Sequence, residues 1–262
     1  MRRIIVRGDD CGADRASTYG ILKCVEAGLL RNVSFMAVGN EIETAAEAFR
    51  GHSDICMGFH FTIFSEWDRV KWNPVSPGGQ IRTLLDKNGV FCQCPQRWQE
   101  SGVPDIEEIR REWNAQLDKL TALGLNITYG DTHMFPELFS DELFSEMKKW
   151  YWQKGLLDHR NYYHLLPDMG NIPRLRENSW NELAQGQYFL LTHPSDPGET
   201  ESRLYGNAEV SGDEVRTQRE DEYRFLTDPQ IKRKWQQAGV ESITYREARP
   251  LGQKEGDARW PE

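Results

Sequence analysis

The sequence predicts an α/β fold in which strands and helices alternate and close into a (β/α) barrel, either TIM-like or a distorted seven-stranded form. Short β-prone runs alternate with amphipathic segments about seven times along the 262 residues. Acidic residues and histidines follow several of these runs. Neither a G-x-G-x-x-G loop nor a Walker A loop follows the first run, which argues against an open nucleotide-binding sheet.

Apolar periodicity places the individual elements. Strands are expected at residues 4–7, 33–38, 55–61, 127–129, 188–192 and 241–245. Helices are expected at residues 14–27, 42–49, 106–123, 140–152 and 221–237. Several helices are followed by glycine, which ends a helix readily because it tolerates the left-handed conformation. No repeat or low-complexity linker divides the chain, so we expect one catalytic domain at 1–250 and a polar tail at 251–262.

Residues 64–102 form a long irregular connection rich in Pro, Gly and Trp, and a connection of this length is usually a lid or a binding loop. Four indoles in predicted loops could stack on the ring of a ligand or simply fill the loop packing: Trp67, Trp72, Trp98 and Trp180. Three more are expected in the core because they lie on helices: Trp113, Trp150 and Trp235. The charged runs at 107–112 and 216–224 are most simply solvated helix faces.

Composition excludes several classes of protein. The formal net charge of −9 argues against a nucleic-acid binder, which needs a basic face. No run approaches the roughly 18 apolar residues of a membrane span, and no signal-peptide segment opens the chain, so we expect a cytoplasmic protein. The five cysteines are expected to be reduced and structural: Cys11, Cys24, Cys56, Cys92 and Cys94. A homodimer is compatible with the sequence but is not indicated by it.

Acids and histidines collect at the carboxyl ends of the predicted strands: Asp9, Asp10, His60, Asp131, His133 and His193. In a barrel these ends converge on one face, where active sites of such folds lie. The plainer interpretation is that polar residues follow strands because loops are exposed.

Asp10, His60 and His133 are candidate ligands of one divalent metal ion, because two imidazoles and a carboxylate leave positions open for water and substrate. On spacing alone, structural histidines are an equal alternative. Two imidazoles favour Zn²⁺ or a similar transition ion over Mg²⁺, which prefers oxygen ligands. Of the other histidines, His52 is expected to be solvated, whereas His159 and His164 could line a pocket but are more simply structural.

The adjacent aspartates suggest a division of labour. If Asp10 binds the metal, Asp9 could take a proton from an activated water. The alternative is an Asx turn that caps the next helix, although Asp14 is available for that role.

Several segments, in order along the chain, resemble motifs of the YdjC-like carbohydrate deacetylases, the family of chitooligosaccharide deacetylase. GDDCG at 8–12 is similar to the family's N-x-D-D-F-G start, and GFHFT at 58–62 to its G-x-H-x-x-L motif. DTH at 131–133 and THP at 192–194 are similar to its D-S-H and T/C-H-P blocks. Weaker likenesses lie at 74–76, 84–91, 219–227 and 239–245.

This resemblance implies a barrel related to the polysaccharide deacetylases and a metal-dependent hydrolase that removes an acetyl group from an N-acetylated sugar. It implies Asp10, His60 and His133 as metal ligands, Asp9 as general base and His193 as general acid. It also allows Mg²⁺ as the metal, so the identity of the cation stays open. The sequence departs from the family where MFPE at 134–137 follows His133 at once, where Cys11 replaces an aromatic residue, and where Arg7 replaces Asn. Two alternatives therefore remain: a barrel metalloenzyme of another class, such as a sugar isomerase or esterase, and a non-catalytic sugar-binding relative.

Overall fold

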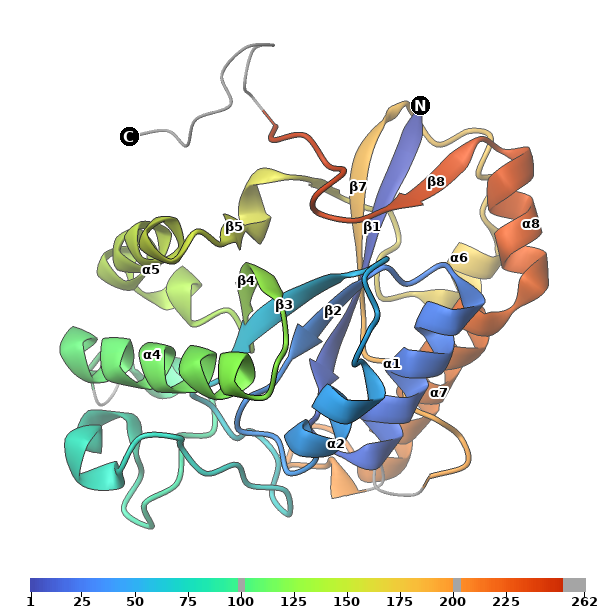
Figure 1. Ribbon diagram of the computed structural model, residues 1–262. Helices are drawn as coiled ribbons and strands as arrows, with labels where there is room; N and C mark the ends of the chain where they lie inside the picture. Colours follow the sequence, from blue (N-terminus) through green and yellow to red (C-terminus); the bar gives the residue numbers. More distant parts are fainter. Residues whose placement is uncertain (99–101, 200–203, 252–262) are drawn as a thin grey trace.

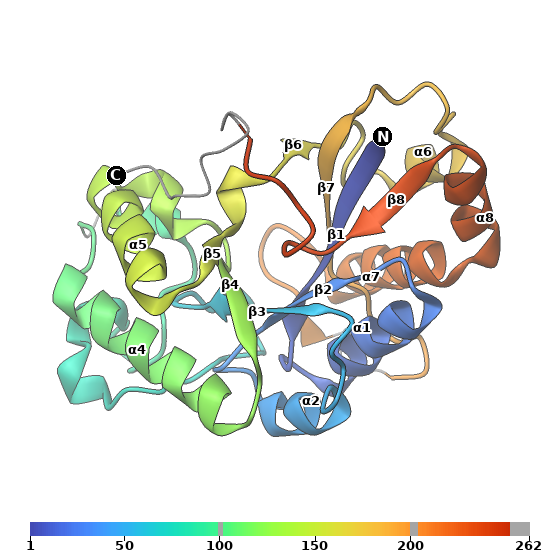
Figure 2. The same cartoon turned by 45° about the horizontal axis from the view of Figure 1, so that its top comes forward.

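The computed structural model describes residues 1–98, 102–199 and 204–251, and it contains a parallel sheet that curls into a half-barrel with helices outside it (Figures 1 and 2). The predicted fold class is confirmed. The strands are β1 (Arg2–Cys11), β2 (Asn32–Phe35), β3 (Cys56–Phe61), β4 (Ile127–Thr132), β5 (Leu157–Asp158), β6 (His164–Leu165), β7 (Gly186–Thr192) and β8 (Val240–Ile243). The α-helices are α1 (Arg15–Ala27), α2 (Ile42–Ala48), α4 (Ile106–Ala122), α5 (Asp141–Lys154), α6 (Ile172–Glu177), α7 (Gly212–Thr227) and α8 (Pro229–Gln237). Of the predicted tail, only Leu251 lies within the described residues.

The eight-stranded sheet runs β5-β4-β3-β2-β1-β7-β6, and β8 pairs with β1. The first half of β1 pairs with β8 and its second half with β2, while β7 runs along its other edge. The two ends of the chain therefore meet on one strand. All of these pairings are parallel, as expected when helices connect successive strands.

Two apolar clusters lie on the two faces of the sheet, and β1 shows how the sequence divides between them. Ile4 and Val6 belong to the large cluster shared with the helices, whereas Ile5 belongs to a small cluster with residues such as Tyr129 and Tyr245. Because side chains alternate along a strand, Arg7 follows Ile5 on the inner face of the half-barrel. The three helical tryptophans are buried as expected: Trp113, Trp150 and Trp235.

The first helix begins and ends where the sequence predicts. The side chain of Asp14 accepts a hydrogen bond from the Ser17 amide at 2.6 Å and so caps α1. Gly28 ends the helix with φ of 90°, in the left-handed region that glycine adopts without strain. Asp9 and Asp10 are therefore not needed as the helix cap. None of the helices in the described ranges combines the length and apolar character required to span a bilayer.

Two predictions about the helices are wrong. The expected single helix at 221–237 is two helices, because Pro229 lacks an amide hydrogen and holds the preceding Asp228 in an extended conformation. The charged runs are also not simply solvated. Glu112 and Arg219 are buried, and each binds partners far away in the sequence. The short elements β5, β6 and α6 were not expected from the periodicity.

A methyl group at Gly58 is expected to destabilise the fold. Its Cβ would lie 2.2 Å from the Tyr129 ring, which is buried between neighbouring strands. Since an overfilled core shifts side chains and backbone, Gly58→Ala is expected to lower the free energy of unfolding by about 1–3 kcal/mol. Urea denaturation measures this change. Gly79→Ala is the matched control, because nothing lies within 4 Å of a Cβ there; equal stability of the two variants would contradict the prediction.

Candidate metal centre

A bulge at the end of β1 brings both aspartates of the GDDCG segment to the same side of the sheet. Three steps of β1, from Gly8 to Cys11, lie opposite two steps of β2. β1 therefore has one extra residue relative to β2, and the backbone of Asp10 adopts a left-handed conformation there, with φ of 64°. In a regular strand adjacent side chains face opposite ways. The bulge explains why Asp9 and Asp10 can both face His60.

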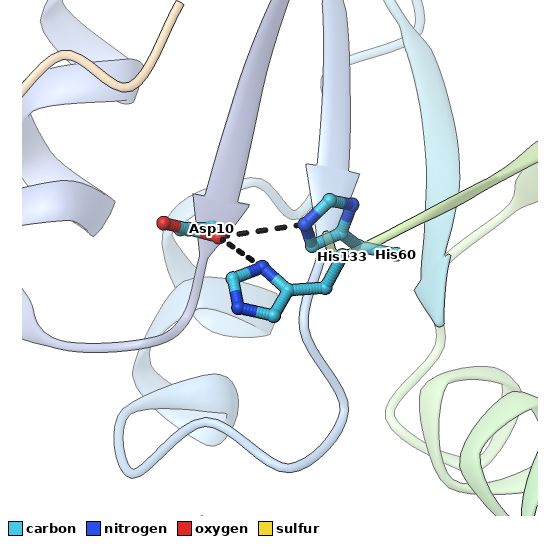
Figure 3. A group of neighbouring side chains, drawn as sticks. All are labelled: Asp10, His60 and His133. Atoms are coloured by element: carbon cyan, nitrogen blue, oxygen red, sulfur yellow. Dashed lines mark ion pairs between the residues drawn. The ribbon is translucent and has the colours of Figure 1, made fainter. Parts of the chain in front are cut away.

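Asp10, His60 and His133 come together as the sequence predicts, from the ends of β1, β3 and β4 (Figure 3). Asp10 Oδ1 lies 3.4 Å from His60 Nε2 and 3.3 Å from His133 Nδ1. Two ligands bound to one Zn²⁺ at about 2.1 Å with tetrahedral angles lie about 3.4 Å apart. Both distances to Asp10 Oδ1 therefore match the spacing of ligands on a single cation, and all three ligand atoms lie within 4.8 Å of one another.

Each imidazole is held from behind by a carboxylate. His60 Nδ1 lies 2.5 Å from Asp131 Oδ1, its direct partner in the β3–β4 register. His133 Nε2 lies 2.9 Å from Glu66 Oε2. Carboxylates in this position accept the N–H of a metal-binding histidine and leave the other nitrogen as a lone-pair donor. The free nitrogens are His60 Nε2 and His133 Nδ1, the two that face Asp10.

The facing atoms lack partners of their own among the described residues. Asp10 Oδ1 and His60 Nε2 are buried without a hydrogen bond. Buried polar atoms are nearly always hydrogen-bonded, so these two adjacent atoms are suited to bind a cation. The chemistry of the donor set, two nitrogens and one oxygen, fits a divalent transition ion.

Without a cation the pocket favours protons on its histidines. Burial lowers the pKa of His60, but the charges of Asp131 and Asp9 outweigh this and raise its pKa to about 9. Burial likewise opposes charge on His133, and Glu66 and Asp10 raise the pKa of its imidazole to about 10. These groups therefore bind either protons or a cation.

A second group of candidate ligands, Asp9 with His60 and Asp131, is less suited to a metal. Arg7 donates to both oxygens of Asp9 at 2.6 Å, and its Nη1 lies 3.0 Å from Asp131 Oδ2. The fully buried guanidinium already supplies the positive charge at this position. Burial raises the pKa of Asp131, but the charges of Arg7 and His60 dominate and lower it.

His193 follows β7 directly, beside the end of β1. Gly8 pairs with Thr192, so Asp9 and His193 are the next residues on neighbouring strands. The backbone amide of His193 donates to Glu222 Oε2 at 2.5 Å, which fixes the loop. Within the described residues no ion pair joins its imidazole to the three candidate ligands, and the ring is partly exposed. Its predicted role as general acid stays a prediction.

The remaining residues singled out from the sequence have mostly structural environments. Trp72, Trp98 and Trp180 are buried, which leaves only Trp67 partly exposed among the four loop indoles. Trp72 packs edge-on against His133, with ring centroids 5.5 Å apart, and so supports a candidate ligand. All five cysteines are free thiols.

The three other histidines lie outside the candidate ligand set. His159 is buried beneath the site, where its Nδ1 lies 2.8 Å from the Tyr163 hydroxyl and 3.3 Å from Arg7 Nη1. His164 is exposed, and His52 is partly exposed beside Phe49.

Sequence reasoning missed three contributors: Glu66, Arg7 and Arg219. Arg7 was noted only as a departure from the family, although strand alternation places it on the same face as Asp9. Arg219 falls in a charged run and in one of the weaker family likenesses, neither of which assigns it a contact with the site. Glu66 lies in the irregular 64–102 connection, whose first part contacts His133 through both Glu66 and Trp72. No local pattern marks Glu66, so only its contact reveals it.

Comparison with known proteins gives a consistent result. A family model described as YdjC-like protein matches residues 3–145, which include all three candidate ligands but not His193. The carbohydrate deacetylase of Geobacillus stearothermophilus is 26% identical over 255 residues, covering 94% of this chain and 98% of the relative. That of Thermoanaerobacter pseudethanolicus is 25% identical over 249 residues, covering 88% and 93%.

A solved structure has the same fold. It is from Enterococcus faecalis, is named provisionally as a cellobiose-phosphate cleavage protein, and superposes with a TM-score of 0.74 over 94% of this chain and 98% of its own. The identity is 17%, so the likeness concerns the fold alone.

Proposed function

Because this chain belongs to the YdjC-like protein family, we propose that it is a metal-dependent carbohydrate deacetylase that removes the acetyl group from an N-acetylated sugar. The observation that carries the proposal is the convergence of two carboxylate-backed imidazoles on one orphaned oxygen of Asp10. Similarity to carbohydrate deacetylases along nearly the whole chain supports the substrate class. We take residues 1–250 as one catalytic unit, since β1 pairs with strands from both halves of the chain.

In this proposal Asp10, His60 and His133 hold one divalent cation, Zn²⁺ or Mg²⁺, with the imidazole nitrogens favouring Zn²⁺. When bound, the cation supplies Lewis acidity, which activates water and stabilises negative charge on a carbonyl oxygen. Asp131 and Glu66 orient the two imidazoles.

The proton transfers fall to Asp9 and His193. Asp9 accepts a proton from the water that attacks the acetyl carbonyl, and Arg7 fixes the orientation of its carboxylate. His193 donates a proton to the sugar nitrogen as the C–N bond breaks, which gives acetate and a free amine. Both residues follow the paired positions Gly8 and Thr192, so they lie at one level of the sheet.

The test is acetate release from a panel of N-acetylated mono- and disaccharides, with and without a chelator. Wild-type protein is expected to release acetate only with the cation, and His60→Ala is expected to lose both cation binding and acetate release. Asp9→Asn is expected to keep cation binding and lose about 10²–10⁴-fold in rate, because it removes only the base.

The outcomes separate the alternatives. If the protein binds one cation per chain but releases acetate from no sugar, the deacetylase assignment is overturned and another hydrolase or an isomerase is favoured. A protein that binds no Zn²⁺ or Mg²⁺ would favour a non-catalytic relative. His52→Ala serves as the control for loss of a histidine away from the site, and it is expected to behave as wild type.

A further inference from the structure

We propose that Arg219 is a positioning residue that sets the cation preference of the site by restricting Asp10 to one ligand oxygen. The inference rests on the proposed function, because it assumes that Asp10, His60 and His133 hold a cation. Arg219 lies on α7, about 200 residues from Asp10 in the sequence, and its Nη2 donates to Asp10 Oδ2 at 2.8 Å.

The contact divides the two oxygens of Asp10 between two partners. Oδ2 is occupied by the guanidinium, whereas Oδ1 has no hydrogen bond and faces the two imidazole nitrogens. For Oδ2 to reach a cation between those imidazoles, the carboxylate would have to turn and break the bond to Arg219. The arrangement therefore offers one oxygen and two nitrogens.

Arg219 is itself held firmly. Its Nη1 donates to Ser17 Oγ at 3.2 Å, and its guanidinium lies over the Tyr205 ring at 4.8 Å. Its backbone carbonyl accepts a hydrogen bond from the Ser195 amide, in the loop after β7. The side chain is only 6% exposed. A buried guanidinium held by both Ser17 and Tyr205 can keep a carboxylate in one orientation, which an exposed arginine cannot do.

The number of oxygens matters because cations differ in what they accept. Zn²⁺ is satisfied by four ligands including nitrogens. Mn²⁺ prefers octahedral oxygen-rich sites, so it gains more from a second carboxylate oxygen. Arg219 therefore favours Zn²⁺ by withholding Oδ2. Its positive charge, in contrast, repels every divalent cation equally and cancels from the ratio of two affinities.

The experiment measures dissociation constants for Zn²⁺ and Mn²⁺ by competition titration on the full-length protein. Arg219→Met has no donor and no charge, and its Mn²⁺/Zn²⁺ dissociation-constant ratio is expected to fall about 10- to 100-fold. Arg219→Lys keeps a charged donor on a long side chain and is expected to retain most of the wild-type ratio. The matched control is Arg224→Met on the same helix, whose pairs with Glu220 and Asp221 lie away from Asp10.

If Arg219 had a purely structural role, Arg219→Met would weaken the binding of Zn²⁺ and Mn²⁺ by the same factor. The ratio of the two dissociation constants would then be unchanged, and that result would overturn the inference. If Arg219→Met does not fold, Arg219→Gln replaces it, since its shorter side chain does not reach Asp10. Failure of the wild type to bind either cation would instead overturn the metal site of the proposed function. The two failures are therefore distinguishable.

Discussion

Replacing Arg7 by methionine is expected to lower the free energy of unfolding by about 3–5 kcal/mol. The guanidinium is fully buried and holds two carboxylates, Asp9 through two hydrogen bonds and Asp131 through an ion pair. Without it, Asp9 loses both hydrogen bonds to a cation, and Asp131 keeps only His60 as a close positive partner. Urea denaturation in the presence of a chelator measures the loss without a contribution from bound metal.

The control is Arg110→Met. The partners of Arg110, Glu107 and Glu146, lie nearer the surface, so this variant is expected to lose less than about 1 kcal/mol in the free energy of unfolding. Adding Asp131→Asn to Arg7→Met is expected to recover part of the loss, because one of the two buried carboxylates that Arg7 neutralises is then uncharged. A loss below about 1 kcal/mol for Arg7→Met alone would contradict this account of the interior.

The affinity of the site for Zn²⁺ is expected to rise about 100-fold per pH unit between pH 7 and pH 9. His60 and His133 have pKa values raised to about 9 and about 10, so both are protonated in the metal-free protein at neutral pH. A cation must displace both protons, and each displaced proton contributes about tenfold per unit. Above these pKa values the competition ends and the affinity levels off.

The same shifts predict how the metal-free fold responds to pH. A histidine whose pKa is raised on folding stabilises the fold fully below its unfolded pKa of about 6.5. That stability is lost as the pH rises through about 9 and about 10. Metal-free protein should therefore become less stable in mildly alkaline solution while its affinity for Zn²⁺ increases.

Calorimetric titration in two buffers of different ionisation enthalpy counts the released protons directly, and a competing chelator of known pH dependence gives the affinity. Release of two protons per cation at pH 7 is the expected result. Mutation of the exposed His164 to Ala is the control and should change neither quantity. A pH-independent affinity would contradict protonated histidines in the metal-free site.

The sequence was sufficient for the barrel class and for the group of three candidate ligands. Each candidate ligand lies at or within a few residues of the end of a β-prone run, a pattern that is local in the sequence. Parallel topology then brings such strand ends together. Helix boundaries marked by a cap or a glycine, as at Asp14 and Gly28, were also predictable. These features depend on neighbours in the chain.

What the sequence did not reveal depends on distant contacts. Arg219 and Glu66 each bind a candidate ligand from an element whose own pattern indicates only a charged helix face or an irregular loop. The burial of Glu112 was predictable, since helical spacing places it beside Ile109 and Trp113 on the apolar face. There its carboxylate accepts hydrogen bonds from two backbone amides of the long connection. Pro229 also indicated a break between two helices, but the amphipathic pattern continues across it and favoured a single helix.

The bulge at the end of β1 has a consequence for how this sequence can diverge. Long surface connections tolerate insertions and deletions, but residues 8–11 have no such freedom. Deleting one residue there would restore simple alternation and turn one of the two acids toward the helices, where Gly8 already packs against Leu30 and Ile21. Descendants of this chain are therefore expected to keep the length of this segment, and a change of length should mark a different chemistry.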